Sequence, residues 1–277
     1  MTGSYGERLR TAVARYGPLC VGIDPHPGVL DRWDLPRDAY GLESCARTMI
    51  EAVAGRVAIV KPQSAFFEAY GSAGIAVLEL LISDAREAGV LVLLDVKRGD
   101  IGSTMDAYTA AYLTDGSPLA VDAMTASPFL GPGSLDGAIA QAERSGRGVY
   151  VLAATSNPEG VTVQQATSPE GGTISQAMID FAAGHNADAA TRGEWGSVGV
   201  VVGATIDPGT GLDFGALNGS ILAPGLGAQG GTADDLRRIF GDAYPLVIPS
   251  NSRGILNAGP EVARIRAAVE ETQQTLV

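Results

Sequence analysis

The segment VLVLLDVKRGDIGST, residues 90–104, has the pattern of a buried strand that leads into a helix. Its first seven residues are apolar apart from Asp95, and such a continuous run is typical of a strand covered on both faces in a parallel sheet. Directly after it, STMDAYTAAYL (103–113) has helical spacing. The stretch therefore predicts one strand followed by one helix, with charged residues at the junction.

The same unit recurs along the chain, which predicts an α/β fold built from repeated βα units. Four further segments have helical spacing: ESCARTMIEAVAG, IAVLELLISDAREAG, ISQAMIDFAAGHNADAATRG and TADDLRRIFG. Including residues 90–96, eight apolar, β-rich runs alternate with such segments; they cover residues 18–24, 57–61, 90–96, 119–125, 148–155, 197–205, 220–225 and 245–250.

Eight repeats favour a closed (β/α)8 TIM barrel, and we expect one such domain over residues 1–277. The alternative is an open, doubly wound sheet. Candidate site residues follow nearly every strand instead of clustering at one switch point, and this favours the barrel. Local signals agree with the predicted helices: Thr232 precedes Asp234 and Asp235 at a helix start, and Gly55 and Gly89 stand at helix ends.

Two connections are longer than the rest: residues 24–42 after the first strand and residues 156–173 after the fifth. Both would lie at the catalytic end of a barrel, where loops longer than about 12–15 residues commonly act as lids or binding loops. The alternative is that neither connection has a function.

Composition excludes several classes of function. The formal net charge is −12, so no basic surface for nucleic acid or an anionic membrane is expected, and an anionic ligand would need locally concentrated cations. Two cysteines, Cys20 and Cys45, make a disulfide framework improbable. The sequence has no apolar core of a signal peptide and no run of the roughly 20 apolar residues that a membrane span needs. We therefore expect a cytoplasmic protein.

The chain contains two lysines, Lys61 and Lys97, although it contains seventeen arginines. Each lysine follows an apolar run, at the point where a buried strand leaves the core. An ammonium group can deliver a proton, whereas a guanidinium group stays protonated at neutral pH. The lysines therefore suggest chemistry, and a purely structural ion network is the alternative.

The charged residues of the opening stretch are spaced so that they can meet. Asp95 and Lys97 share a face if the strand continues through them, while Asp100 and Thr104 follow in the loop and the first helical turn. Two carboxylates and an ammonium at a barrel mouth are costly to desolvate unless they pair with one another. We expect a preorganised charged array.

This DxKxxDI pattern, followed by a threonine, resembles the signature of the orotidine 5'-phosphate decarboxylase family. VGIDPHP (21–27) and VKPQSAFFEAYG (60–71) resemble the ends of the family's first two strands, in its longer-looped second type. The resemblance implies that Asp24 binds ribose hydroxyls and that Lys61 joins the charged array with Lys97, Asp95 and Asp100.

Three later segments extend the resemblance to the last strand. APGLGAQGG (223–231) resembles the family's phosphate loop, with Gln229 between phosphate and pyrimidine, and NSRGI (251–255) resembles its phosphate grip, with Arg253 as the cation. Loops after strands 7 and 8 are where many barrels bind phosphate. LAATSNPEG (152–160) resembles the end of strand 5, which implies that Ser156 hydrogen-bonds the pyrimidine.

The resemblance implies conversion of orotidine 5'-monophosphate to uridine 5'-monophosphate and carbon dioxide, without cofactor or metal, as the last step of de novo pyrimidine nucleotide synthesis. It also implies a homodimer in which Asp100 and Thr104 reach into the partner's site. Three alternatives remain open at this point: a metal-dependent phosphosugar decarboxylase or synthase of the same barrel group, a Schiff-base aldolase using Lys61 or Lys97, and a phosphate-binding barrel without catalysis.

The histidines and tryptophans do not require functions. His26 and His185 have no ligand at zinc-binding spacing, and His185 is expected on a helix face. Trp33 and Trp195 are expected to anchor packing.

Overall fold

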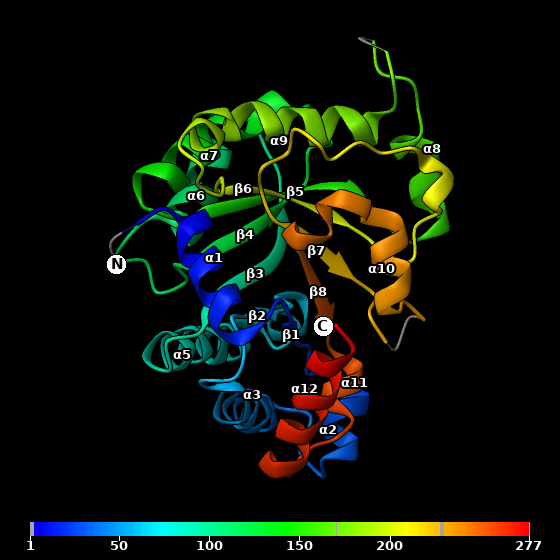
Figure 1. The fold of residues 1–277 in the computed structure, drawn as a ribbon. Helices are drawn as coiled ribbons and strands as arrows, with labels where there is room; N and C mark the ends of the chain where they lie inside the picture. The colour runs from blue at the N-terminus through cyan, green and yellow to red at the C-terminus, as the bar shows by residue number, and fades with distance from the viewer. Residues whose placement is uncertain (1–2, 170, 228–229, 277) are drawn as a thin grey trace.

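Eight parallel strands form a closed barrel in the computed structural model, which describes residues 3–169, 171–227 and 230–276. Neighbouring strands pair in chain order, and β8 closes the ring on β1 through Cys20 opposite Ser250 and Val21 opposite Asn251. Each predicted apolar run overlaps one strand, so the expected (β/α)8 barrel is confirmed (Figure 1). The strands are β1 (Cys20–Ile23), β2 (Ile59–Pro62), β3 (Leu91–Arg98), β4 (Ala123–Ala126), β5 (Gly148–Ala154), β6 (Val198–Val202), β7 (Ile221–Pro224) and β8 (Val247–Asn251).

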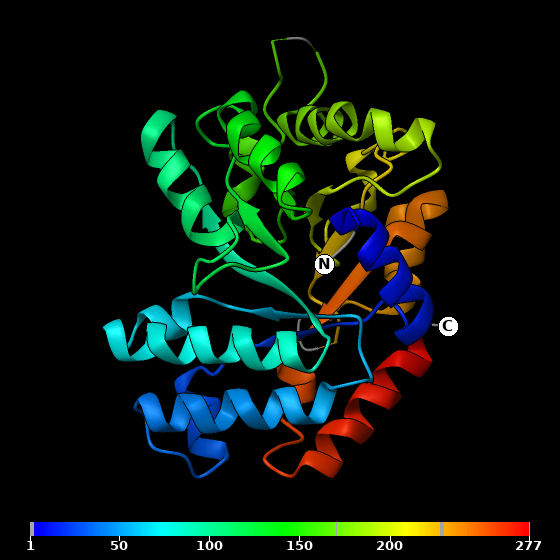
Figure 2. The same ribbon diagram turned by 90° about the vertical axis from the view of Figure 1, so that its left-hand side faces the viewer.

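Helices surround the strands, and α3 lies between α5 and α12 (Figure 2). The described α-helices are α1 (Tyr5–Tyr16), α2 (Pro27–Arg32), α3 (Ala39–Val53), α4 (Ala65–Glu68), α5 (Gly71–Glu87), α6 (Gly102–Leu113), α7 (Asp136–Arg144), α8 (Val161–Gln164), α9 (Ile174–Thr191), α10 (Ala233–Phe240), α11 (Arg253–Leu256) and α12 (Val262–Thr275). Short 3-10 helices are η1 (Pro132–Leu135), η2 (Pro158–Gly160), η3 (Pro208–Thr210) and η4 (Gly241–Leu246).

All five predicted helical segments are helices, namely α3, α5, α6, α9 and α10. The signals at their ends hold as well: Thr232 and Asp235 form a reciprocal capping box at α10, and Gly55 and Gly89 have positive φ after α3 and α5. The repeat is imperfect after β6, where the described connection to β7 contains η3 in place of an α-helix.

Inward side chains from successive strands fill the barrel interior. Helix α1 closes the end of the barrel at which the strands begin. Tyr5 and Leu9 of α1 are fully buried among the interior residues. The Tyr5 hydroxyl lies 2.9 Å from the Tyr150 hydroxyl, which lies 2.5 Å from Ser220 Oγ. With this end filled, the open end of the barrel is the one at which the strands terminate.

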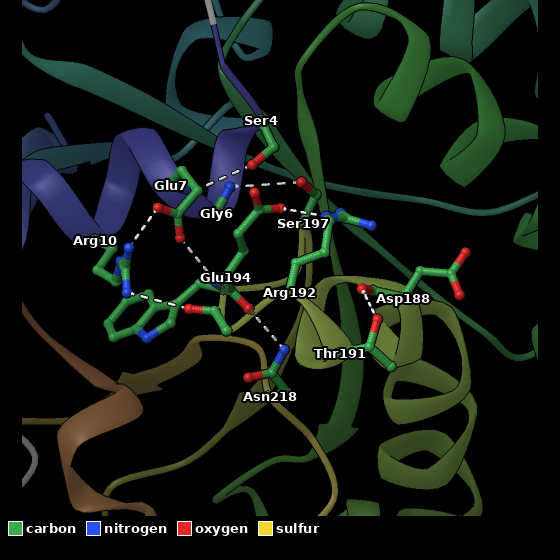
Figure 3. A network of polar contacts seen from close by, with 12 residues as sticks. Ser4, Gly6, Glu7, Arg10, Asp188, Thr191, Arg192, Glu194, Ser197 and Asn218 are labelled. Carbon is green, nitrogen blue, oxygen red and sulfur yellow. Dashed lines mark hydrogen bonds and ion pairs between the residues drawn. The ribbon is translucent and has the colours of Figure 1, made fainter.

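A polar network ties α1 to the connection between α9 and β6 (Figure 3). Glu7 accepts a hydrogen bond from the Trp195 amide at 2.9 Å and pairs with Arg10 at 2.6 Å. Gly6 lies so close to this connection that an added Cβ would stand 2.1 Å from the Trp195 carbonyl oxygen. The network and this close approach hold α1 against the barrel.

The long connection after β1 is folded, because it contains α2 and leads into α3. Trp33, at the end of α2, is 4% exposed and donates from Nε1 to the Leu256 carbonyl at 2.9 Å. The structure thus confirms its expected role in packing. Cys20 and Cys45 are both buried and unpaired, and no helix within the described ranges is long and apolar enough to cross a membrane.

Candidate active site

A cavity of about 340 Å³ opens at the ends of the strands. Its lining comes from the whole ring: polar side chains stand at the ends of β1 to β5 and of β8, whereas apolar residues and glycines line the cavity at the ends of β6 and β7. The lining includes six of the predicted site residues: Asp24, Lys61, Asp95, Lys97, Ser156 and Arg253. Residues far apart in the sequence therefore meet at one site, as the barrel topology requires.

Four of these side chains form a row of alternating charge. Lys97 Nζ lies 2.6 Å from Asp95 Oδ1, Lys61 Nζ lies 3.4 Å from Asp95 Oδ2, and Lys61 Nζ lies 4.0 Å from Asp24 Oδ1. Lys61 and Asp95 are 5% and 7% exposed, whereas the Lys97 side chain is 46% exposed. The buried pair therefore supports one accessible ammonium group that faces the cavity.

Burial and the neighbouring charges shift the pKa values of Lys61 and Asp95 in opposite directions. Burial disfavours the ammonium form of Lys61, but the carboxylates of Asp24 and Asp95 outweigh it and raise the pKa of Lys61. Burial likewise disfavours the Asp95 carboxylate, yet Lys61, Lys97 and a hydrogen bond from Thr125 lower its pKa. Both groups are consequently charged at neutral pH, so the row is a preorganised set of charges.

The end of β3 is irregular where it carries this chemistry. The pairing of β3 with β4 shifts between Leu94 and Arg98, and Lys97 has a positive φ of 45°. Left-handed backbone is uncommon for a residue other than glycine and tends to occur at functional sites. Asp95 and Lys97 share the cavity side as predicted, although the strand does not continue regularly between them.

The connection after β5 forms part of the cavity wall, and side-chain hydrogen bonds within this connection hold it in place. Gln164 on α8 accepts from the Thr155 amide at 2.9 Å and donates to Thr155 Oγ1 at 2.7 Å. Ser156, the next residue, is exposed at the cavity rim beside Asn157. The long connection is thereby tied back to the strand end that carries Ser156.

Arg253 marks the opposite side of the cavity, after β8, where Gly225 and Leu226 also line it. Its side chain is exposed, and its guanidinium makes no hydrogen bond or ion pair to any residue within the described ranges. The Gly227 amide donates to the Gly231 carbonyl at 2.9 Å, so these two residues lie side by side after β7. Gln229, the predicted bridge to phosphate, lies outside the described residues.

Asp100 and Thr104 are not brought into the cavity of their own chain. Asp100 Oδ1 accepts a hydrogen bond from the Ile101 amide at 2.8 Å, and Thr104 is exposed on the first turn of α6. Neither residue belongs to the described lining. The array of one chain therefore consists of Lys97, Asp95 and Lys61 with Asp24.

Gln63 and Thr125 are two of the polar lining residues that were not among the predicted ones. Gln63 follows β2 and Thr125 is the third residue of β4; both face the cavity. The sequence could have indicated both residues, because each is polar and stands at the end of an apolar run, as the predicted site residues do. Threonine is common in strands, however, and this makes Thr125 inconspicuous in the sequence.

The cavity differs in charge from the chain as a whole. Its described lining contains three cationic side chains, Lys61, Lys97 and Arg253, against the carboxylates of Asp24 and Asp95. This is an excess of one positive charge in a chain with net charge −12. Cations are thus concentrated where an anion would bind, as the composition required.

The remaining candidates lie away from this chemistry. His185 is on α9, as predicted, with Nε2 3.1 Å from Asp136 Oδ1, and Trp195 is partly buried against α1. Within the described ranges, no group of three histidine, cysteine, aspartate or glutamate side chains could hold a metal ion.

Comparison with known proteins agrees with the geometry. The model of the orotidine 5'-phosphate decarboxylase / HUMPS family matches residues 17–268. The chain is 58% identical over 267 residues to orotidine 5'-phosphate decarboxylase of Salinispora arenicola, covering 96% of this chain and 95% of the relative, and 51% identical over 266 residues to that of Streptomyces coelicolor, covering 96% and 94%.

Solved structures give the same result. A crystal structure from Streptomyces avermitilis, assigned as an orotidine 5'-phosphate decarboxylase, has a TM-score of 0.94 at 48% identity and covers 99% of this chain and 95% of its own. The OMP decarboxylase of Leishmania donovani has a TM-score of 0.76 at 29% identity, covering 99% and 97%. The charged row, the fold and these relatives together place the chain in the orotidine 5'-phosphate decarboxylase family.

Proposed function

We propose that this chain decarboxylates orotidine 5'-monophosphate to uridine 5'-monophosphate and carbon dioxide, without a cofactor, as the last step of de novo pyrimidine nucleotide synthesis. The observation that supports this most strongly is the accessible Lys97 ammonium, fixed 2.6 Å from the buried Asp95 carboxylate at the mouth of a barrel. The family of the chain and the names of its relatives supply the substrate.

In the proposed reaction the bond between the pyrimidine ring and its carboxylate breaks, and carbon dioxide leaves without the bonding electrons. The electron pair stays on the ring carbon, and Lys97 stabilises it with an ammonium charge that is already in position. Lys97 then donates a proton to that carbon and is reprotonated from solvent. Lys61 keeps Asp95 charged from the buried side, and Asp95 holds Lys97 in place.

One charge pair cannot account for the whole rate enhancement. A unit charge pair about 4 Å apart at an effective dielectric near 20 is worth roughly 4 kcal/mol, whereas enzymes lower barriers by about 8–23 kcal/mol. Binding energy from parts of the substrate that do not react must contribute. Arg253 is the cation available for the substrate phosphate, and the family resemblance adds Gln229.

Two further residues are proposed to position the nucleoside. Asp24 binds ribose hydroxyls, because its Oδ1 is buried without a hydrogen-bond donor among the described residues. Ser156 hydrogen-bonds the pyrimidine from the cavity rim after β5. Each assignment predicts a raised KM in the alanine variant.

We further propose a homodimer that shares its active sites through Asp100 and Thr104. Both residues lie outside the cavity of their own chain, next to exposed apolar side chains that suit an interface: Ile101 is 62% exposed, Phe129 79% and Leu130 52%. Ile101 and Phe129 follow the adjacent strands β3 and β4. A second copy seated there could present Asp100 to the charged row.

A mixed dimer tests the shared site. Subunits carrying Lys97→Ala and subunits carrying Asp100→Ala are each expected to be inactive alone and to recover about one competent site per dimer when mixed. Absence of any recovery in a verified mixed dimer would reject the arrangement.

The function itself is tested by adding orotidine 5'-monophosphate to metal-free protein in excess chelator and following the loss of its ultraviolet absorbance. We expect turnover by the wild type and none by Lys97→Ala. No turnover by the wild type would refute the proposal, and activity that appears only when the chelator is omitted would favour the metal-dependent alternative. Trapping of a substrate adduct by borohydride would favour a Schiff-base aldolase.

We also propose that the enzyme works in the cytoplasm. Both cysteines are unpaired and buried, which suits a reducing compartment. Fractionation of cells that express the chain tests this, and recovery outside the cytoplasmic fraction would contradict it.

A further inference from the structure

The end of β3 is held by one side chain from the neighbouring strand. Leu94 pairs with Met124 and Arg98 pairs with Ala126, so the residues between them on β3 face Thr125 alone on β4. These residues are Asp95, Val96 and Lys97. Two extra residues must therefore bulge out of the strand, and their amides lose the partners that a regular ladder would supply.

The hydroxyl group of Thr125 replaces those partners. Thr125 Oγ1 accepts a hydrogen bond from the Val96 amide at 3.1 Å and another from the Lys97 amide at 2.9 Å. It also donates to Asp95 Oδ1 at 2.8 Å. This carboxylate oxygen is the one that lies 2.6 Å from Lys97 Nζ.

A threonine hydroxyl has one donor and two acceptor positions, and all of them are used here. Because both acceptor positions are occupied by amides, the hydroxyl hydrogen can only point to Asp95. Thr125 is itself 1% exposed, so water cannot take over these bonds without a rearrangement of the site. The orientation of the Asp95 carboxylate and the backbone of Lys97 thus depend on the same atom.

We propose that Thr125 is a positioning residue for decarboxylation, which acts by fixing the β3 bulge that presents Lys97 and by orienting the carboxylate of Asp95. The proposal rests on the proposed function and adds to it a residue outside the family's charged motif. Thr125 does not need to touch the substrate for this role. Its contribution is to the geometry from which Lys97 approaches the ring.

A pH profile distinguishes positioning from a general loss of structure. Asp95 is faced by Lys61 from β2, Lys97 from β3, Asp24 after β1 and the buried Cys20 thiol of β1, and all of these remain in a Thr125 variant. Loss of the hydroxyl removes one donor to the carboxylate, which favours its protonated form. The acid limb of kcat/KM is therefore expected to move to higher pH.

The test compares full-length Thr125→Val, Thr125→Ser and Thr109→Val. Valine keeps the shape of threonine without the hydroxyl, and serine keeps the hydroxyl. Thr109 is a second buried threonine, which donates to the Met105 carbonyl within α6, so Thr109→Val controls for the loss of a buried hydroxyl elsewhere. Sites are counted by titration with uridine 5'-monophosphate, so that rates refer to folded, binding-competent protein.

Loss of hydrogen bonds to a charged group, at about 1.5–3 kcal/mol, corresponds to a decrease of about 10- to 100-fold in kcat for Thr125→Val, with KM changed less than about threefold. Thr125→Ser and Thr109→Val are expected to stay within about threefold of the wild type. Wild-type kcat in Thr125→Val, equal impairment of the serine variant, or an unmoved acid limb would overturn the proposal. If the valine variant does not fold, a tenfold loss in the folded serine variant would also overturn it. Failure of the wild type to turn over orotidine 5'-monophosphate would instead refute the proposed function.

Discussion

Replacement of Asp95 by asparagine tests whether the charged row is a coupled unit. Asp95 is the one carboxylate within 3.5 Å of both lysine ammonium groups among the described residues. Asparagine has nearly the same shape and can still hydrogen-bond, so the change removes mainly the charge. Lys61, which is 5% exposed, would keep only Asp24, at 4.0 Å.

The expected cost follows from these distances. A pair of unit charges 3.4 Å apart, the separation of Lys61 and Asp95, is worth about 5 kcal/mol at an effective dielectric near 20. Removal of one partner from a buried pair costs about 3–5 kcal/mol, because the remaining charge stays desolvated. The partly exposed Lys97 adds little, since solvent screens it. We therefore expect the free energy of unfolding of Asp95→Asn to fall by about 3–5 kcal/mol.

Equilibrium unfolding in urea measures this change, and Asp31→Asn is the matched control. Asp31 makes two hydrogen bonds to Arg37, at 2.8 and 2.5 Å, but both residues are exposed. Exposed pairs contribute about 0–1 kcal/mol, so the control should lose no more than that. A loss below about 1 kcal/mol in Asp95→Asn, equal to the control, would show that the row is not a coupled buried unit.

Because the pKa of Asp95 is lowered in the folded state, its contribution to stability is full above the ordinary value of 3.8 and is lost as pH falls through the lower folded value; acid titration of unfolding should show this loss in the wild type and not in Asp95→Asn. Gln164→Ala should raise KM for orotidine 5'-monophosphate several-fold by releasing the loop that carries Ser156, whereas Gln165→Ala should not, and equal KM values in steady-state assays would contradict this. Gly6→Ala should destabilise the chain by about 1–3 kcal/mol in urea unfolding because its Cβ would stand 2.1 Å from a backbone oxygen, and a stability equal to the wild type would refute that contact.

Much of the fold could be predicted from the sequence because each strand is buried on both faces. Such strands appear as continuous apolar runs, and eight of them at regular intervals left few arrangements besides a barrel. Helices α1, α7 and α12 were not among the predicted segments. Helix α1 fills the end of the barrel at which the strands begin, where the Tyr5 hydroxyl lies 2.9 Å from that of Tyr150, and a contact between residues so far apart in the sequence leaves no local pattern.

The site could be predicted in part for a similar reason. Asp95 and Lys97 share a strand end, so their proximity follows from local geometry. Thr125 was missed because its role depends on the bulge in β3, which exists only when β3 and β4 are paired. Asp100 lies outside the described lining of its own chain, and its expected role involves a second chain.

Replacement of Lys97 by arginine tests whether Lys97 delivers the proton that replaces carbon dioxide. Arginine keeps the positive charge but does not release its proton at neutral pH. The measurement is kcat for orotidine 5'-monophosphate, with binding of uridine 5'-monophosphate as the control for an intact site. We predict a loss of about 10²–10⁴-fold, the usual contribution of general acid catalysis, with product binding retained. A kcat within tenfold of the wild type would show that Lys97 is not the proton donor.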